Sequence, residues 1–209
     1  MSTTRIDAAF YFDLASPLAY LAAEQALAGL GGPAPWQPVL ARELPGAERF
    51  DAFRCAAEAD AFREDVARRA GALGLQPVRW PASFPFDSEL AMRVATYAKE
   101  IGRTVPFAQA AFRQAFAGGH DLSDPDYVLI AAAACEMHPR AVLAAAQRES
   151  IGDQLRVATA AALRDGVRDV PAVRVGERVF HGEREIAAAR AALEAHSTAP
   201  PAGWGPASR

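Results

Sequence analysis

The stretch FYFDLASPLAYL, residues 10–21, decides the fold. Its first residues end an apolar, aromatic run of strand length that extends from Ile6 to Phe12. The residues that follow contain a helix-start signal, with no long loop in between. Ser16 is a residue type favoured at the capping position of a helix, and Pro17 suits the first helical turn because its backbone angle is already helical. The stretch therefore predicts a strand that turns directly into a helix.

The sequence that follows predicts a strand–helix–strand unit. Apolar residues at helical spacing continue to Leu30, and the Gly31–Pro33 segment ends the helix. The segment Trp36–Leu40 has the length and composition of a second short strand. Two strands joined through a helix are normally parallel, with a right-handed crossover between them.

The central part of the chain has a different character. From Pro45 to Gly166, long Ala-rich stretches carry apolar residues at helical spacing, and strand-like alternation is scarce. This pattern predicts a helical insertion of about five helices. Glycines and prolines mark the breaks between them, at residues 71–85, 102–106, 118–119, 123–125 and 138–139.

After Gly166 the strand pattern returns. Two short runs, Ala172–Val175 and Arg178–Phe180, flank a Gly-Glu turn and predict a hairpin, and an amphipathic helix is expected from Glu183 to Ala195. The chain is thus predicted to be an α/β protein with a thioredoxin-like fold, βαβ at the start and ββα at the end, and an inserted all-helical domain. The expected boundaries are 1–44 and 166–196 for the thioredoxin-like domain, 45–165 for the helical domain and 197–209 for a flexible tail.

Composition excludes several classes of function. The net charge is −3 with a pI of about 5.8, and no segment forms a basic stripe, so a nucleic-acid partner is not expected. No apolar run is long enough to span a bilayer, and residues 1–7 lack the pattern of a signal peptide, so we expect a cytoplasmic protein. Cys55 and Cys135 lie far apart without CxxC spacing, and the histidines show no ligand spacing, so no metal site is expected.

Three motifs occur in order along the chain. The first is residues 10–21. The second is WPASFPFDSELAMR, residues 80–93, and the third is GVRDVPAV, residues 166–173, with Phe-His-Gly at 180–182. Together they resemble the DsbA-like branch of the thioredoxin superfamily that contains 2-hydroxychromene-2-carboxylate isomerases and kappa-class glutathione transferases.

The resemblance places Ser16 where disulfide oxidoreductases have their first redox cysteine, and Ala19 where they have the second. Dithiol exchange by this motif is therefore excluded on chemical grounds. The resemblance implies that the Ser16 hydroxyl donates a hydrogen bond to the sulfur of bound glutathione, while the helix N-terminus stabilises the thiolate. The alternative is that Ser16 is a plain helix cap.

The third motif implies a cis bond between Val170 and Pro171, with the Val170 backbone pairing to the cysteinyl unit of glutathione. An ordinary trans proline at a strand start is the alternative. Where the family has a lysine that holds glutathione, this chain offers Arg42. Where the family has an aspartate for the γ-glutamyl end, it has Arg184, and the neighbouring Glu183 or Glu185 is the candidate to replace that carboxylate.

The remaining candidates concern the substrate. Asp87 and the adjacent Ser88 either cap the helix that runs to Ile101 or face the cleft, and the aromatic side chains of the second motif either line an acceptor pocket or pack internally. The expected pocket residues are Pro17, Trp80, Phe86, Asp87 and His181.

The resemblance implies a glutathione-dependent isomerase that acts on an aromatic unsaturated 2-oxo acid through a reversible thiolate adduct, with Arg42 or Arg184 holding the substrate carboxylate. A kappa-like glutathione transferase or peroxidase is one alternative. A non-redox DsbA-like domain that binds another thiol, a peptide or a partner protein is the other. Family analogy also suggests a homodimer.

Overall fold

The computed structural model describes residues 8–29, 34–47 and 55–198. Short 3₁₀ turns lie at Ala41–Glu43 (η1), Pro45–Ala47 (η2) and Glu183–Glu185 (η3). The strands and α-helices are β1 (Ala8–Phe12), α1 (Pro17–Gly29), β2 (Trp36–Pro38), α3 (Ala56–Ala72), α4 (Glu89–Glu100), α5 (Thr104–Phe116), α6 (Pro125–Ala133), α7 (Pro139–Gln147), α8 (Glu149–Arg164), β3 (Ala172–Val175), β4 (Arg178–His181) and α9 (Ile186–Thr198).

The four strands form one mixed sheet in the order β2-β1-β3-β4. Strand β2 pairs parallel to β1, while β3 pairs antiparallel to both β1 and β4. The turn between β3 and β4 contains Gly176 at a φ of 59°, a left-handed conformation that glycine adopts without strain. The predicted βαβ and ββα units, and with them the α/β thioredoxin-like fold, are confirmed.

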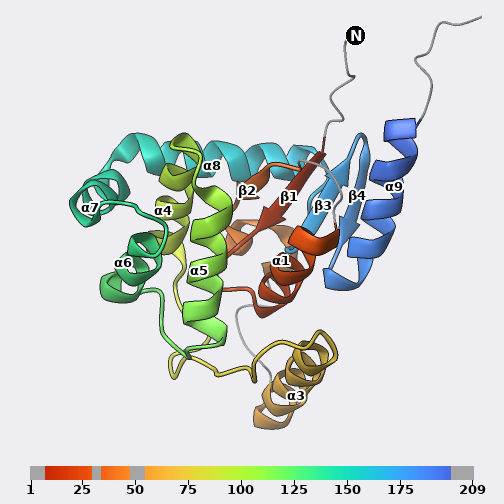
Figure 1. Cartoon of the computed structure of the whole chain (residues 1–209), viewed down its shortest axis with the longest axis horizontal. Helices are drawn as coiled ribbons and strands as arrows, with labels where there is room; N and C mark the ends of the chain where they lie inside the picture. Colours follow the sequence, from red (N-terminus) through yellow and green to blue (C-terminus); the bar gives the residue numbers. More distant parts are fainter. Residues whose placement is uncertain (1–7, 30–33, 48–54, 199–209) are drawn as a thin grey trace, which may run out of the picture.

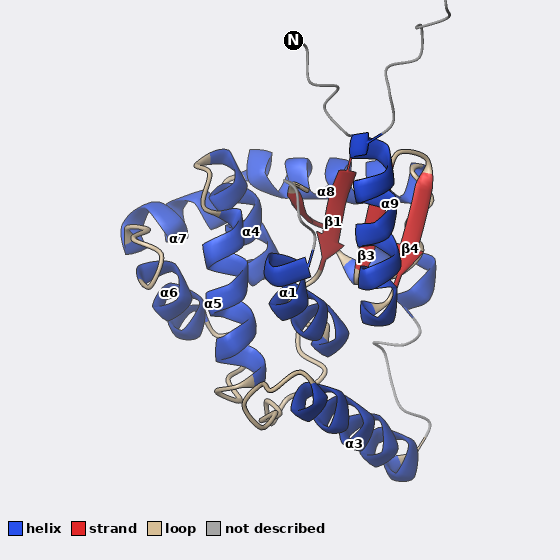
Figure 2. Cartoon of the chain, turned by 45° about the vertical axis from the view of Figure 1, so that its right-hand side comes forward, coloured by secondary structure: helices blue, strands red, loops and turns tan. Residues whose placement is uncertain are grey.

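Alternating side chains of β1 supply two separate cores. Phe10 and Phe12 are fully buried on the face covered by α1 and α9, and both pack edge-on against Trp36 of β2. Tyr11 points to the opposite face, where it joins a smaller cluster with Ala162 of α8. Figure 2 shows α1 and α9 in front of the sheet and α8 behind it. Burial of each aromatic ring stabilises the fold by about 1.5–3 kcal/mol.

The helices between β2 and β3 lie mainly at one end of the sheet, with α4 to α7 forming the left-hand part of Figure 1. Helix α5 packs against α1, and Phe112 contacts the rings of both Phe12 and Tyr20. The sheet and the helical part therefore share one continuous core. The predicted boundaries at 44/45 and 165/166 stay predictions.

The break between α7 and α8 was not predicted from sequence, because no glycine or proline marks it. Arg148 has an extended backbone there and ends one helix while it begins the next. Arg93 of α4 donates hydrogen bonds to the carbonyl oxygens of Ala146, at 2.6 Å, and Arg148, at 2.9 Å. A Cβ at Gly152 would meet the Arg93 guanidinium, so a larger residue there would force the end of this side chain to shift. The described residues of the insertion thus form six α-helices, α3 to α8, where the sequence predicted about five.

Two other segments differ slightly from expectation. Strand β2 ends at Pro38, two residues earlier than predicted, and the last helix starts with the η3 turn before α9. Helix α9 continues to Thr198, and residues 199–209 of the predicted tail lie outside the described residues.

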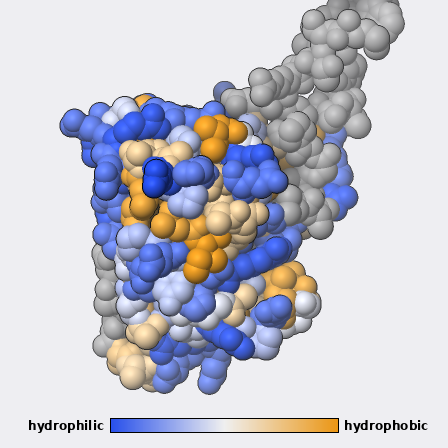
Figure 3. Space-filling view, turned by 60° about the vertical axis from the view of Figure 1, so that its left-hand side comes forward, coloured by the Kyte–Doolittle hydropathy of each residue, from blue (hydrophilic) through white to orange (hydrophobic). Residues whose placement is uncertain are grey.

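The surface at the α6 and α7 end is partly apolar. Ile130 of α6 is 50% exposed and Leu143 of α7 is 38% exposed. Figure 3, which brings this side forward, shows a hydrophobic patch surrounded by hydrophilic side chains. Over the three described ranges, no helix has both the length and the apolar character needed to cross a membrane.

Candidate active site

Ser16 lies at the junction of β1 and α1, as predicted. Its hydroxyl oxygen accepts a hydrogen bond from the Ala19 N–H at 3.1 Å, and its carbonyl accepts from the Tyr20 N–H at 3.0 Å. Ser16 therefore caps α1, while its own hydroxyl proton remains for a second bond. The first turn of α1 carries no acidic side chain that would offset the positive end of the helix dipole. Ser16 is only 1% exposed.

The sheet register brings the third motif beside this junction. Tyr11 pairs with Ala172 at the end of the β1–β3 ladder, so the next two positions on β3's side, Pro171 and Val170, come opposite Phe12 and Asp13. The Val170–Pro171 peptide bond is cis. Val170 is 3% exposed and packs in the same small core cluster as Ala41, just after β2. The first and third motifs thus meet at one end of the sheet.

Asp13 ties the site together, and sequence reasoning did not single it out. Its buried carboxylate accepts hydrogen bonds from the Ala15 N–H at 2.9 Å and the Ala41 N–H at 2.8 Å, and it also bonds to the Ser88 hydroxyl. Burial raises the pKa of Asp13 from its ordinary value of 3.8, against the lowering effect of these donors and of Arg42. One side chain therefore fixes the segment before Ser16, the η1 turn and the start of α4.

A pocket of about 260 Å³ opens beside these groups. This volume approaches the lower end of small-ligand sites. Ala15 contributes to its wall, so the pocket reaches the residue directly before Ser16. Its lining residues come from the first motif, the η1 turn and the second motif: Asp13, Ala15, Ala41, Arg42, Pro85, Phe86, Asp87 and Ser88.

The two roles considered for the Asp87–Ser88 pair are divided between them. Asp87 accepts a hydrogen bond from the Glu89 N–H at 2.9 Å and so caps α4, while the Ser88 side chain turns inward to Asp13. Both residues also line the pocket.

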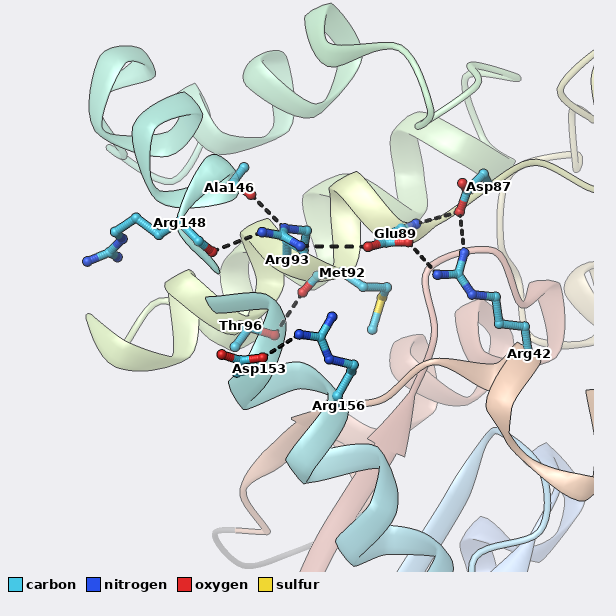
Figure 4. A network of polar contacts seen from close by, with 10 residues as sticks. All are labelled: Arg42, Asp87, Glu89, Met92, Arg93, Thr96, Ala146, Arg148, Asp153 and Arg156. Atoms are coloured by element: carbon cyan, nitrogen blue, oxygen red, sulfur yellow. Dashed lines mark hydrogen bonds and ion pairs between the residues drawn. The ribbon is translucent and has the colours of Figure 1, made fainter. Parts of the chain in front are cut away.

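Arg42 stands at the rim of this pocket in an ionic network. Its guanidinium donates to Asp87 at 2.9 Å and also to Glu89, and these bonds raise the pKa of Arg42 above its usual value, Glu89 contributing most. Figure 4 shows the network continuing from Glu89 to Arg93, which holds the α7–α8 break. The pocket rim is thereby connected to the helical part of the molecule.

Other predicted pocket residues lie elsewhere. Trp80 packs edge-on against Phe84 and Phe116 and has the Arg63 guanidinium 5.8 Å above its ring, so its aromatic role is internal packing. Pro17 is buried at the start of α1. Neither Trp80 nor Pro17 lines the pocket.

His181 lies at the end of β4, where its Nε2 accepts a hydrogen bond from the Arg168 N–H at 3.0 Å. Burial lowers the pKa of His181 from its ordinary value of 6.5. The neutral ring is the form that accepts this bond. His181 therefore supports the loop before Pro171 rather than the wall of the pocket.

Glu183, the candidate to hold the γ-glutamyl end, is 6% exposed and paired within the chain. It binds the Arg69 guanidinium of α3, and Arg184 lies 3.7 Å from the same carboxylate. The Arg184 side chain is largely exposed. Glu183 thus links α3 to the end of the sheet.

The residues of the site fit the thiol of a glutathione molecule better than they fit its peptide part. Ser16 at the start of α1 suits a thiolate, because a helix N-terminus and a hydroxyl donor both stabilise negative charge. The peptide end fits less well, since the Val170 N–H already donates to Asp169 at 2.8 Å and Glu183 is paired with Arg69. No group of three or more metal-binding side chains occurs among the residues whose structure is described.

The pocket residues that sequence reasoning missed were Asp13, Ala15, Ala41 and Pro85. Asp13 carried a usable signal, because an acidic residue directly after an apolar strand lies at the edge of the sheet where ligands bind. The other three are small or apolar residues that carry no chemical signal in the sequence.

The family model for the DsbA-like thioredoxin domain matches residues 8–194, nearly the whole chain. The protein belongs to this family. No curated protein sequence matches the chain.

Three solved structures share its fold. A 2-hydroxychromene-2-carboxylate isomerase superposes with a TM-score of 0.79 at 17% identity, covering 90% of this chain and 95% of the other. A probable DsbA oxidoreductase from Streptomyces coelicolor gives a TM-score of 0.78 at 19% identity over 97% and 95% of the two chains. The cytosolic disulfide reductase DsbM from Pseudomonas aeruginosa, solved with GSH, gives 0.64 at 16% identity over 90% and 98%.

Proposed function

We propose that the protein is a thiol-dependent isomerase of the 2-hydroxychromene-2-carboxylate isomerase type, with glutathione as the thiol and an aromatic unsaturated 2-oxo acid as substrate. The observation that carries the proposal is the placement of Ser16. A hydroxyl, and no cysteine, caps α1 directly after Ala15, which lines the small pocket, and the Val170–Pro171 bond is cis. Such a site can hold a ligand thiol but cannot exchange a disulfide of its own.

Each part of the site has a separate task in this proposal. The bound thiolate supplies a nucleophile that adds reversibly to a conjugated double bond, so that the resulting single bond can rotate. Ser16 donates a hydrogen bond to the sulfur, and the α1 N-terminus favours its ionised form. Phe86 and Pro85 offer the apolar wall of the pocket. Arg184, largely exposed and 3.7 Å from the Glu183 carboxylate, is a candidate to bind the substrate carboxylate.

Support for glutathione comes from the DsbM neighbour, which was solved with GSH. The test is calorimetric titration of reduced glutathione, with the ultraviolet absorbance of the thiolate as a second signal. We expect micromolar-to-millimolar binding to the wild type, with weaker binding and a weaker thiolate signal in Ser16→Ala. Ser16→Thr, which retains a hydroxyl, should restore part of both. Ser150→Ala, an exposed serine in the first turn of α8, is the matched control.

Absence of binding up to about 10 mM, a free energy of only about −2.7 kcal/mol, would remove glutathione from the proposal. A substrate screen then separates the enzyme classes, because a transferase would yield a stable thioether whereas an isomerase returns the thiol and a rearranged acid. A non-enzymatic domain that binds another thiol or a peptide is the second candidate. The internal pairing of Glu183 with Arg69 favours it, since this carboxylate is not open to a γ-glutamyl group.

A further inference from the structure

The loop that precedes β3, residues 168–171, is held at both ends by the chain itself. At its start the Arg168 N–H donates to the His181 ring at 3.0 Å. At its end the Pro171 carbonyl accepts from the Gly182 N–H at 2.8 Å. Both partners belong to the end of β4, so this side of the loop is fastened to the sheet.

The middle of the loop is bonded within itself and to the η2 turn. The Asp169 carboxylate accepts a hydrogen bond from the Val170 N–H at 2.8 Å, and the Gly46 N–H of the η2 turn donates to the Arg168 carbonyl at 2.7 Å. A Cβ on Gly46 would lie 2.8 Å from Cγ of Asp169, so the turn rests directly against the aspartate. The Val170 N–H is therefore bonded within the loop, and the η2 turn packs against the carboxylate that binds it.

We propose that Asp169 is a specificity-determining residue of the thiol site: its carboxylate occupies the Val170 N–H and so lowers the affinity for peptide thiols such as glutathione. This inference rests on the proposed function and on the pairing of the Val170 backbone with the ligand's peptide part that the family resemblance implies. A peptide carbonyl that binds the Val170 N–H must first displace a charged acceptor, and bonds to charged acceptors are stronger than neutral ones. A thiol without a peptide group does not compete for this N–H.

The test measures the binding of two thiols, reduced glutathione and 2-mercaptoethanol, to the wild type, Asp169→Ala and Asp169→Asn. Removal of the acceptor in Asp169→Ala should tighten glutathione binding about tenfold, which corresponds to about 1.4 kcal/mol. Asp169→Asn keeps an oxygen that can accept the same bond but is neutral and so a weaker acceptor, and its affinity should therefore lie between those of the wild type and Asp169→Ala. Binding of 2-mercaptoethanol should be equal in all three proteins. Asp169→Gly provides a second variant without the acceptor if the alanine variant does not fold.

The outcomes separate this inference from the proposed function. If both thiols bind but the alanine and glycine variants bind glutathione no better than the wild type, Asp169 does not control specificity. If Asp169→Asn gains as much affinity as Asp169→Ala, repulsion between the aspartate and the glutathione carboxylates is the cause, and competition for the Val170 N–H is refuted. If no thiol binds to any of the proteins, the thiol site itself is refuted together with the role of Asp169.

Discussion

Replacement of Asp13 by alanine should destabilise the protein strongly. The substitution removes a carboxylate that is 2% exposed and leaves the Ala15 and Ala41 N–H groups without their acceptor. A buried donor without a partner costs about 1–3 kcal/mol, so the two together predict a loss of about 2–6 kcal/mol in the free energy of unfolding. Asp13→Asn should lose about half as much, because its amide oxygen keeps one bond while its NH₂ group faces the other donor.

The assay is urea unfolding followed by circular dichroism, with the slopes of the transitions compared to confirm that the unfolded states are alike. Asp60→Ala is the matched control, because Asp60 is exposed in α3 and lies 3.6 Å from Arg63 in a surface ion pair. Such a pair is worth at most about 1 kcal/mol. A loss of less than about 0.5 kcal/mol in Asp13→Ala would show that Asp13 does not hold the three segments together.

The same residue predicts a pH dependence. Because burial raises the pKa of Asp13 above 3.8, the folded protein binds this proton more tightly than the unfolded chain does. The contribution of Asp13 to stability should therefore fall as the pH rises from 3.8 through the raised pKa. The difference in unfolding free energy between wild type and Asp13→Asn isolates this contribution, and a difference that grows with pH would contradict the assigned direction.

Two further predictions concern titratable groups away from the pocket. Since burial lowers the pKa of His181, wild-type stability relative to His181→Gln should be constant above about pH 6.5 and decrease as the pH falls below it; a relative increase would refute the neutral ring as acceptor. The exposed Cys55 should react rapidly with a disulfide reagent in the native protein, whereas the buried Cys135, whose pKa burial raises, should react only after unfolding. Fast reaction of both Cys55 and Cys135 in the native protein would contradict the predicted difference in their reactivity.

The sequence predicted those parts of the structure that depend on local pattern. The β1–α1 junction follows from the residue types around Ser16, and the hairpin follows from two short apolar runs around a glycine turn. The α7–α8 break depends instead on Arg93, a side chain more than fifty residues away that binds carbonyl oxygens at the break. Periodicity along the chain carries no information about such a contact.

In the candidate site, too, some features follow from local sequence pattern and others depend on residues far apart in the chain. Asp87 and Phe86, which were predicted for a substrate pocket, line the cavity described above, because the second motif places them just before a helix. Their role in binding a substrate stays a prediction. The bonds of Asp13 were not predicted. The donors to its carboxylate are the backbone N–H groups of Ala15 and Ala41, and backbone groups carry no signal in the sequence. The pairing of Glu183 with Arg69 likewise joins residues from distant segments.

In the proposed function, an arginine holds the substrate carboxylate, and the charges around the pocket help to decide which arginine that is. Arg42 lines the pocket, but Asp87 and Glu89 already share its guanidinium. A ligand carboxylate at Arg42 would have to displace one of these partners and would then lie beside the remaining one, in a pocket that Asp13 also lines. Repulsion between like charges at such short range opposes this arrangement. In the proposed function, the surroundings of Arg42 therefore favour a neutral part of the substrate in the pocket. The other candidate for the substrate carboxylate is Arg184, which is largely exposed and lies 3.7 Å from Glu183.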